Sequence, residues 1–325
     1  QLEQYVRQSA DNELPRPTGD GIGTIEYNSN LAHFYAHFVR HTVDTSLEGL
    51  TIVYDGANGA ASSVGPEILS GLGAKVININ VNPDGLNIND HCGSTHIEGL
   101  QVAVQQHNAD LGIANDGDAD RCLLVDEKGQ VLDGDQIMLL CALKLKEEGK
   151  LKDDTVVGTV MSNIGFHKAA EELGMKTVST AVGDRYVLEY MREHDLSVGG
   201  EQSGHVIFLD HNTTGDGMLT AVQVAALMKE KNQPLSELAG IMTKYPQVLI
   251  NVRVATKTGW EDNDLIKAAI VTAEGELGVE GRVLVRASGT EPLIRVMAEG
   301  PNQEELQSLC QEIADIIGRE QGLAE

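Results

Sequence analysis

The chain has 325 residues, of which 41% are hydrophobic and 4% aromatic, so two or three domains with aliphatic cores are expected. A formal net charge of -25 argues against nucleic acid or an anionic membrane surface as a partner. No apolar run approaches the roughly 18 residues of a membrane span and no signal-peptide pattern opens the sequence, which makes the cytoplasm the expected compartment.

Residues 2–8 predict a short helix, and a link rich in Pro and Gly follows it. A second helix is predicted over residues 30–42, where His33, His37 and His41 recur at every fourth position. This spacing puts three imidazoles on one helix face, where they could hold zinc or nickel, but no nearby carboxylate or cysteine completes a set of ligands. A role in the structure of the helix is therefore favoured over a metal site for these histidines.

Strands and helices alternate after residue 50, beginning with a predicted strand over residues 51–55 and a predicted helix over residues 59–72. This alternation predicts mixed sheets with helices on their faces. A second α/β unit begins near residue 134 and resembles the first, which suggests an internal duplication. A smaller α+β layer follows residue 245. The predicted fold class is thus α/β, with two consecutive mixed-sheet α/β domains and a smaller α+β C-terminal domain. The expected divisions are 1–29 as a remnant of a preceding domain with its linker, 30–133, 134–244 and 245–325.

An acidic segment follows the apolar run 109–114, and its three carboxylates belong to Asp116, Asp118 and Asp120. In an extended backbone, alternate residues point to one side, so the three carboxylates would project together and repel one another. All-oxygen ligation suits a hard cation such as Mg²⁺. An EF-hand calcium loop is the first rival, although Arg121 stands where that loop needs glycine and the flanks read as strands. A solvated acidic turn is the second.

Two further loops carry polar groups between glycines. The segment 199–205 contains Glu201, Ser203 and His205, which can grip sugar hydroxyls and move a proton. The segment 286–292 together with Arg295 can hold a phosphate, through two guanidiniums, hydroxyls and a glycine. Both loops follow predicted strands, so we expect them to meet the acidic loop at one cleft.

The DGDADR, GEQSGH and RASGTEP loops, in this order, resemble those of the α-D-phosphohexomutase superfamily. The segments 82–89 and 92–96 make the resemblance closest to its amino-sugar branch. It implies interconversion of glucosamine 6-phosphate and glucosamine 1-phosphate through a phosphoserine and a 1,6-bisphosphate intermediate, for UDP-N-acetylglucosamine and cell-wall synthesis. The family's Ser-His-Asn-Pro loop is not in this sequence, so the chain is expected to be a fragment that is inactive alone.

The resemblance also assigns roles to residues. One Mg²⁺ per chain would be held by Asp116, Asp118 and Asp120, and glucosamine 1,6-bisphosphate would be the activating intermediate. Arg121 would support the transferred phosphoryl group, and His205 is the candidate for proton transfer. The substrate-binding residues would be Glu201, Ser203, Arg185, Arg286, Ser288, Gly289, Thr290 and Arg295.

Several alternatives stay open at this point. A phosphomannomutase or phosphoglucomutase would use the same chemistry on another sugar. A haloacid-dehalogenase-type phosphatase would use Asp116 as a nucleophile, although its motif has Thr or Val where this chain has Asp120. A non-catalytic module binding divalent ions and sugar phosphates is the third. The expected partner is a small amino-sugar phosphate, and the sequence leaves a homodimer open.

Overall fold

The computed structural model describes residues 2–10, 16–28, 30–289 and 291–322. The chain divides between Tyr35 and Ala36 into two units, which we describe separately. The first unit holds helix α1 (Leu2–Ala10), the short 3-10 helix Gly19–Gly21 and the beginning of α2 (Asn30–Arg40). All remaining elements belong to the second unit. None of the described helices combines the length and apolar character needed to cross a membrane.

The first sheet of the second unit is mixed, with the order β2-β1-β3-β4-β5. Its strands are β1 (Thr51–Asp55), β2 (Lys75–Ile79), β3 (Leu111–Asn115), β4 (Cys122–Asp126) and β5 (Val131–Leu132). The first three pair in parallel, and β4 and β5 are antiparallel. Helices α3 (Val64–Gly71) and α4 (Glu98–His107) belong to this layer. Leu100 and Val104 of α4 pack on Val53 and Val125 of the sheet.

The second sheet repeats this arrangement with the order β7-β6-β8-β9, parallel except for β9. Its strands are β6 (Thr155–Thr159), β7 (Lys176–Thr180), β8 (Val198–Gly200) and β9 (Val206–Phe208). Its helices are α5 (Gly134–Glu147), α6 (Ile164–Glu172), α7 (Asp184–Glu193), α8 (Gly217–Lys231) and the short α9 (Leu235–Leu238). The shared strand order supports the predicted duplication. Helix α8 contacts β3 and β4, so it ties the two layers together.

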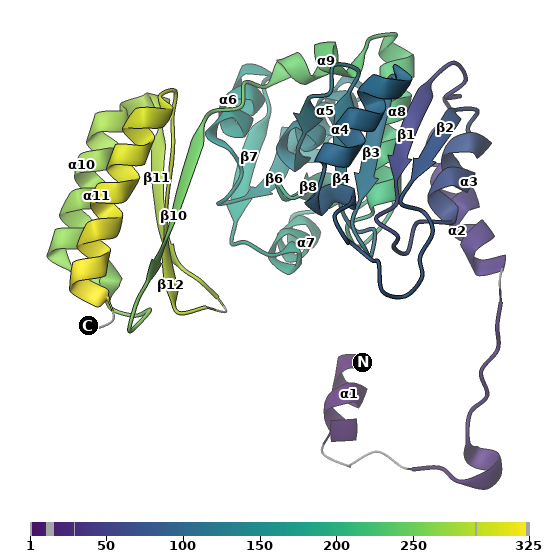
Figure 1. Ribbon diagram of the computed structural model, residues 1–325, viewed down its shortest axis with the longest axis horizontal. Coiled ribbons are helices and arrows are strands. Elements are labelled where there is room, and N and C mark those ends of the chain that lie inside the picture. The colour runs from purple at the N-terminus through teal and green to yellow at the C-terminus, as the bar shows by residue number, and fades with distance from the viewer. Residues whose placement is uncertain (1, 11–15, 29, 290, 323–325) are drawn as a thin grey trace. The chain divides into compact units, whose positions relative to one another are not determined.

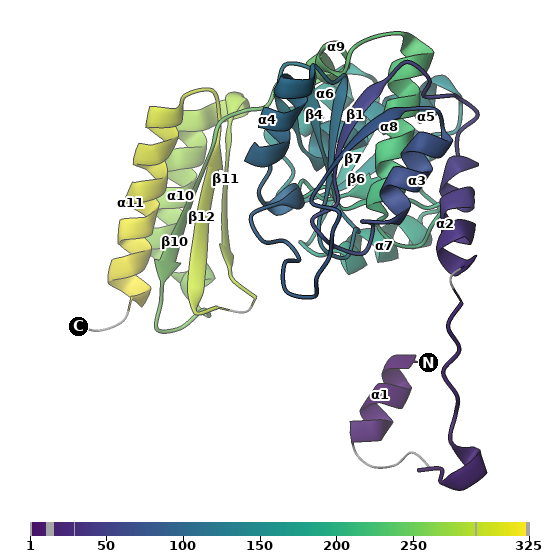
Figure 2. The ribbon, with the colours of Figure 1, turned by 45° about the vertical axis from the view of Figure 1, so that its right-hand side comes forward.

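The C-terminal layer is an antiparallel sheet with the order β10-β12-β11. It comprises β10 (Gln247–Arg253), β11 (Arg282–Ala287) and β12 (Leu293–Glu299). Helices α10 (Asp264–Leu277) and α11 (Gln303–Gln321) cover one face of this sheet, as Figures 1 and 2 show. Ile266, Ile294, Val296, Leu306 and Ile313 form the centre of the core between them. The predicted fold class is confirmed by these three sheets.

The main difference from the predicted elements lies after β1. We expected a helix over residues 59–72, but α3 begins only at Val64. Residues 56–63 form turns, with Ala57 and Asn58 in the left-handed region. Asp55 accepts a hydrogen bond from the Ala57 N–H at 2.9 Å and so stabilises a turn where the sequence pattern suggested a helix. This turn brings the chain against the acidic loop.

Candidate active site

The acidic loop spans residues 116–121, between the end of β3 and the start of β4. Asn115 is fully buried and closes the loop, because its Nδ2 donates to the Arg121 carbonyl at 2.7 Å and its Oδ1 accepts from the Tyr54 hydroxyl at 3.0 Å. Gly117 lies so near Gly59 that a Cβ on Gly59 would stand 2.3 Å from the Gly117 carbonyl oxygen. Small residues at these positions therefore allow the turn after β1 to brace the loop.

The three predicted metal ligands converge in this loop. Ligand oxygens of Asp116, Asp118 and Asp120 lie within 4.8 Å of one another, and among the described residues they form the only such group of His, Cys, Asp or Glu. The expected extended backbone is wrong, because residues 117 and 118 form a turn and Ala119 is left-handed with φ 62°. The turn, not strand alternation, brings the carboxylates together. The flanking elements are strands, so the EF-hand alternative is also wrong.

The electrostatics of this cluster fit a divalent cation. Burial, followed by the Asp120 carboxylate, raises the pKa of Asp116 to about 6. Oδ1 of Asp120 is buried and has no hydrogen-bond partner. Crowded carboxylates with a buried, unpartnered oxygen are energetically costly unless a cation or a proton joins them. A hard ion with oxygen ligands satisfies this donor set.

Arg121 stands beside the cluster. Its backbone N–H donates to Oδ1 of Asp116 at 3.2 Å, and its Nε lies 3.9 Å from Oδ2 of the same carboxylate. The Nε atom has no hydrogen-bond partner although it is buried, and the side chain as a whole is 43% exposed. The guanidinium can therefore take an anionic ligand next to the acidic loop.

The segment 199–205 is the turn of the β8–β9 hairpin. Glu201, Gln202 and Ser203 line a cavity of about 290 Å³, together with Thr159, Met161 and Val182. Oε1 of Glu201 accepts from the Gly183 N–H at 2.8 Å, so the loop that leads into α7 lies against it. Arg185, in the first turn of α7, pairs with Glu189 at 2.7 Å and is 79% exposed on its side chain. Glu201 and Ser203 thus line one shallow cavity, together with apolar side chains.

The hairpin turn and the acidic loop are joined directly. Nδ1 of His205 lies 2.8 Å from Oδ2 of Asp120, and the Gly215 N–H donates to Nε2 of His205 at 3.0 Å. Because Nε2 accepts, Nδ1 carries the proton and donates it to Asp120. Arg121 and His205 also form a β-bridge. The imidazole is 3% exposed, so in this structure it orients a carboxylate of the acidic cluster and both of its ring nitrogens are hydrogen-bonded.

The predicted phosphate loop connects β11 to β12. Arg286 and Arg295 are direct cross-strand partners, and Nε of Arg295 is buried without a hydrogen-bond partner. Burial, followed by the charge of Arg295, lowers the pKa of Arg286. Ser288 is 3% exposed and its hydroxyl accepts from the Glu291 N–H at 3.3 Å. A Cβ on Gly289 would meet no atom within 4 Å, so the space beside this residue is open. Thr290 lies outside the described residues.

Lys257 is a residue that the sequence motifs did not reveal. Its Nζ donates to the carbonyl oxygens of Ser288 at 2.8 Å and of Gly289 at 3.2 Å. An ammonium beside this loop adds positive charge and holds the backbone in place. It comes from the connection after β10 and stands 31 positions before Ser288, and no spacing rule links the two. The meeting of the phosphate loop with the other two loops stays a prediction.

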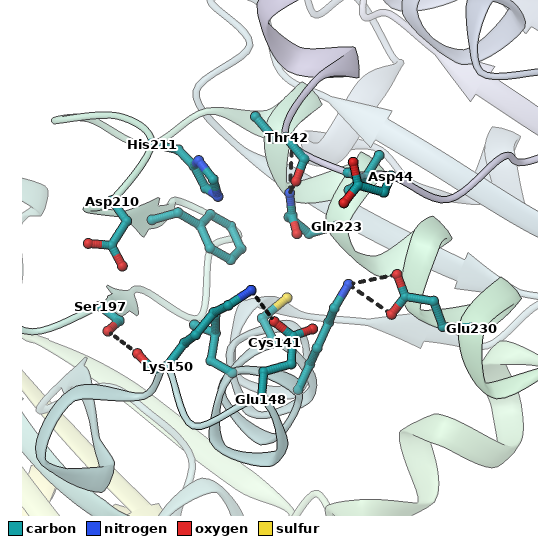
Figure 3. Close-up of a pocket in the computed structure, with 14 residues that line it drawn as sticks. Thr42, Asp44, Cys141, Glu148, Lys150, Ser197, Asp210, His211, Gln223 and Glu230 are labelled. Carbon is teal, nitrogen blue, oxygen red and sulfur yellow. Dashed lines mark hydrogen bonds and ion pairs between the residues drawn. The ribbon is translucent and has the colours of Figure 1, made fainter.

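A separate cavity of about 350 Å³ lies along the second halves of α5 and α8 (Figure 3). Its lysines are neutralised, since Lys144 pairs with Glu230 at 3.0 Å and Lys150 with Glu148 at 2.7 Å. Burial raises the pKa of Cys141 to about 12, which keeps this thiol protonated near neutral pH. None of the predicted site residues lines this cavity. The acidic loop and the 199–205 turn instead meet the opposite ends of these helices, where the Gly217 N–H donates to the Ala119 carbonyl and the Gly134 N–H donates to the Gln202 carbonyl.

Three family models match the chain in succession. Their descriptions are phosphoglucomutase/phosphomannomutase alpha/beta/alpha domain II over residues 27–129, alpha/beta/alpha domain III over 133–245, and the C-terminal domain over 249–316. Together they cover most of the chain. The protein therefore belongs to the phosphoglucomutase/phosphomannomutase family of phosphohexomutases. This membership confirms the resemblance predicted from the three loops. It also rules out the alternative of a haloacid-dehalogenase-type phosphatase.

Curated proteins similar to this chain include phosphoglucosamine mutases, which are isomerases. The chain is 54% identical to that of Desulforamulus reducens, with 98% of this chain and 72% of the relative covered. It is 50% identical to that of Bacillus subtilis, over 99% of this chain and 72% of the relative. The chain thus spans about seven tenths of the length of these relatives.

Solved structures share the fold. A phosphoglucomutase/phosphomannomutase family protein from Burkholderia thailandensis has a TM-score of 0.78 at 20% identity, covering 98% of this chain and 69% of that one. Aspergillus fumigatus N-acetylphosphoglucosamine mutase, in complex with GlcNAc-6P and magnesium, has a TM-score of 0.71 at 22% identity. That match covers 90% of this chain and 67% of the other. Both likenesses support the arrangement of the three layers.

Proposed function

We propose that this chain provides the metal, sugar and phosphate loops of an enzyme that interconverts glucosamine 6-phosphate and glucosamine 1-phosphate. The observation that carries the proposal is the hydrogen bond between His205 and Asp120. It joins the acidic cluster to the hairpin turn whose Glu201 and Ser203 line the cavity, so a cation and a sugar would be neighbours. The amino-sugar substrate is taken from relatives that are named phosphoglucosamine mutases and are about 50% identical to this chain.

Asp116, Asp118 and Asp120 would hold the cation, which we propose to be one Mg²⁺ per chain. When bound, it would neutralise charge on the transferred phosphoryl group. Arg121 would add a guanidinium donor to the same phosphoryl oxygens, because its Nε lies 3.9 Å from Oδ2 of Asp116 and has no hydrogen-bond partner. Phosphoryl transfer depends mainly on positioning and charge stabilisation, and these four side chains supply both.

Glu201 and Ser203 would bind sugar hydroxyls in the cavity of about 290 Å³. Arg185 would contact the substrate from the start of α7, where the Gly183 N–H already bonds to Glu201. His205 is the candidate for proton transfer. Its Nε2 accepts from Gly215, so proton transfer at Nε2 requires that hydrogen bond to open, whereas its Nδ1 proton keeps Asp120 oriented.

Arg286, Ser288, Gly289 and Arg295 would hold the phosphate that does not react, with Thr290 as the further predicted contact. Binding energy spent on that phosphate can orient the reacting end of the sugar. A glucosamine 1,6-bisphosphate intermediate would bind in either of two orientations, because each of its phosphates can occupy this loop. The cytoplasmic location and a homodimer remain predictions.

The proposal is tested by binding, because the family's Ser-His-Asn-Pro loop is not among these 325 residues. Calorimetry with glucosamine 6-phosphate, mannose 6-phosphate and glucose 6-phosphate, each with Mg²⁺ present, should give the highest affinity for the amino sugar. Equal affinities would move the assignment to the phosphomannomutase or phosphoglucomutase alternative. If the chain binds Mg²⁺ but none of the three sugar phosphates, the proposal fails and the chain is a module that binds divalent ions.

A further inference from the structure

Glu299 is the last residue of β12 and its side chain is completely buried. It is flanked in the sheet by its two cross-strand partners, Gln247 on β10 and Arg282 on β11. Nε of Arg282 donates to Oε2 of Glu299 at 2.6 Å, and Nε2 of Gln247 donates to Oε1 at 2.9 Å. Burying a carboxylate costs free energy unless several donors form hydrogen bonds with it. The two cross-strand partners of Glu299 supply two of these donors.

The remaining donors to Glu299 come from the preceding layer. The backbone N–H of Ile164, the first residue of α6, donates to Oε2 at 2.9 Å, and Nδ2 of Asn163 donates to Oε1 at 3.3 Å. The first N–H groups of a helix lack partners within the helix, and the helix dipole favours negative charge there. Glu299 therefore caps α6 with a carboxylate from another sheet.

Additional contacts hold the start of α6 in place. Nη2 of Arg282 donates to the Ser162 carbonyl at 2.5 Å, and Oδ1 of Asn163 accepts from the Tyr245 N–H at 3.0 Å. A Cβ on Gly165 would stand 2.0 Å from the Thr243 carbonyl oxygen, so this segment approaches the helix start as closely as only glycine allows. The start of α6 thus meets both the C-terminal sheet and the chain that leads into it.

A second ion pair crosses the same boundary but differs in character. Lys168 of α6 pairs with Glu280 at 3.2 Å, and the Glu280 side chain is 63% exposed. Exposed pairs of this kind contribute little to rigidity or stability. The buried Glu299 carboxylate is therefore the contact that can define an orientation.

We propose that Glu299 is a positioning residue that sets the orientation of the C-terminal sheet relative to α6. The phosphate loop lies at the other end of β12, roughly 20 Å from Glu299 at 3.4 Å per residue. A tilt of about 10° at Glu299 would therefore move the loop by roughly 3–4 Å, which exceeds the tolerance of a hydrogen bond. The orientation itself does not depend on the proposed function. Only its use, which is to place the phosphate loop for a sugar phosphate, rests on that function.

The test measures a distance between two spin labels, introduced as Glu171→Cys on α6 and Glu312→Cys on α11. Both positions are exposed, and the four native thiols are buried and stay unlabelled. We expect a single narrow distance distribution in the parent protein. Glu299→Gln should shift or broaden it, because the amide carries no charge at the helix start and directs an NH₂ group toward donors. Circular dichroism of each labelled variant verifies that it is folded.

Ile164→Pro is the sharper variant. Proline is well tolerated at the first helical position, and Asn163 before it already has the extended conformation that precedes proline, with φ -58° and ψ 144°. The substitution removes the N–H that Glu299 accepts and leaves α6 intact, so it should also broaden the distribution. Glu280→Gln, which breaks the exposed pair, is the matched control and should leave the distribution unchanged.

An unchanged distribution in folded Glu299→Gln and Ile164→Pro would overturn the proposal, and so would equal broadening in Glu280→Gln. Because no sugar phosphate is present, these outcomes are independent of the proposed function. In a second measurement, Glu299→Gln should weaken glucosamine 6-phosphate binding while leaving Mg²⁺ binding as in the parent. Lost Mg²⁺ affinity would instead indicate general damage to the structure and would contradict a positioning role.

Discussion

Arg286 and Arg295 face each other across neighbouring strands, as a direct cross-strand pair of like charges. Such a pair destabilises a sheet by itself, and the charge of Arg295 adds to burial in lowering the pKa of Arg286. Glu291 pairs with Arg295 at 3.2 Å but leaves Nε of that guanidinium without a partner. The arrangement therefore stores an unfavourable interaction that a bound phosphate would relieve.

The first prediction concerns this pair. Arg286→Gln should raise the free energy of unfolding without ligand by about 0.2–1 kcal/mol, the usual size of a cross-strand pair interaction. It should also abolish the rise in melting temperature that inorganic phosphate produces in the parent. Arg253→Gln, on the exposed side of β10 opposite Leu293, is the matched control and should retain the phosphate effect. Undiminished phosphate stabilisation in Arg286→Gln would place the anion elsewhere.

The second prediction concerns the cation. Asp118→Asn should weaken Mg²⁺ binding, measured by calorimetry, because it removes one negative ligand from the acidic cluster. Asp90→Asn changes an exposed carboxylate outside the cluster and should bind Mg²⁺ as the parent does. If Asp118→Asn keeps the parental affinity, the ion does not bind between these three carboxylates.

The third prediction separates two roles of His205. His205→Ala removes the donor that orients Asp120, and partners of this kind typically contribute about 10–100-fold to metal affinity. We therefore expect a loss of Mg²⁺ affinity of about 10-fold, although no metal ligand is removed. His194→Ala removes an exposed imidazole at the end of α7 and should have no effect. Unchanged affinity in His205→Ala would show that the hydrogen bond does not orient a ligand.

The fourth prediction concerns Asp135, which is fully buried in the first turn of α5. Burial, followed by the charge of Asp133, raises the pKa of Asp135 to about 7. The folded protein then keeps a proton that the unfolded chain releases, so this carboxyl group stabilises the fold at low pH. Its contribution is lost as the pH rises from about 4 to 7, at no more than about 1.4 kcal/mol per unit.

Asp135→Asn removes this titration. The free energy of unfolding is measured in urea at pH 5 and pH 8 for the variant and the parent. The difference, variant minus parent, should be more positive at pH 8 than at pH 5. Asp264→Asn, in the exposed first turn of α10, should show no such change in the difference. A stability difference that is equal at both pH values would mean that Asp135 has an ordinary pKa in the folded protein.

The sequence predicts the order of the layers and the polar loops well, because both depend on local patterns. Alternating apolar segments identify the strands, and glycines mark the three loops. The two α/β layers also have the same strand order, which the short similarity between their sequences indicates. The predicted metal ligands follow from three carboxylates in five positions, and the structure brings these carboxylates together.

The geometry of the site could not be predicted in the same way. The turn at Ala119 and the clamp by Asn115 depend on contacts with Tyr54 and with residues near Gly59, which lie far away in the sequence. The occupied ring nitrogens of His205 likewise depend on Asp120 and Gly215. Contacts over such separations leave no periodic pattern.

The acidic loop is held by the layer that follows it as much as by its own. The Cys122 N–H donates to the Gly204 carbonyl, the Gly217 N–H donates to the Ala119 carbonyl, and His205 orients Asp120. A segment ending near residue 133 would carry all three carboxylates but none of these supports. The proposed ion binding is therefore not portable: transplanting DGDADR into another scaffold would transfer the three carboxylates without their arrangement.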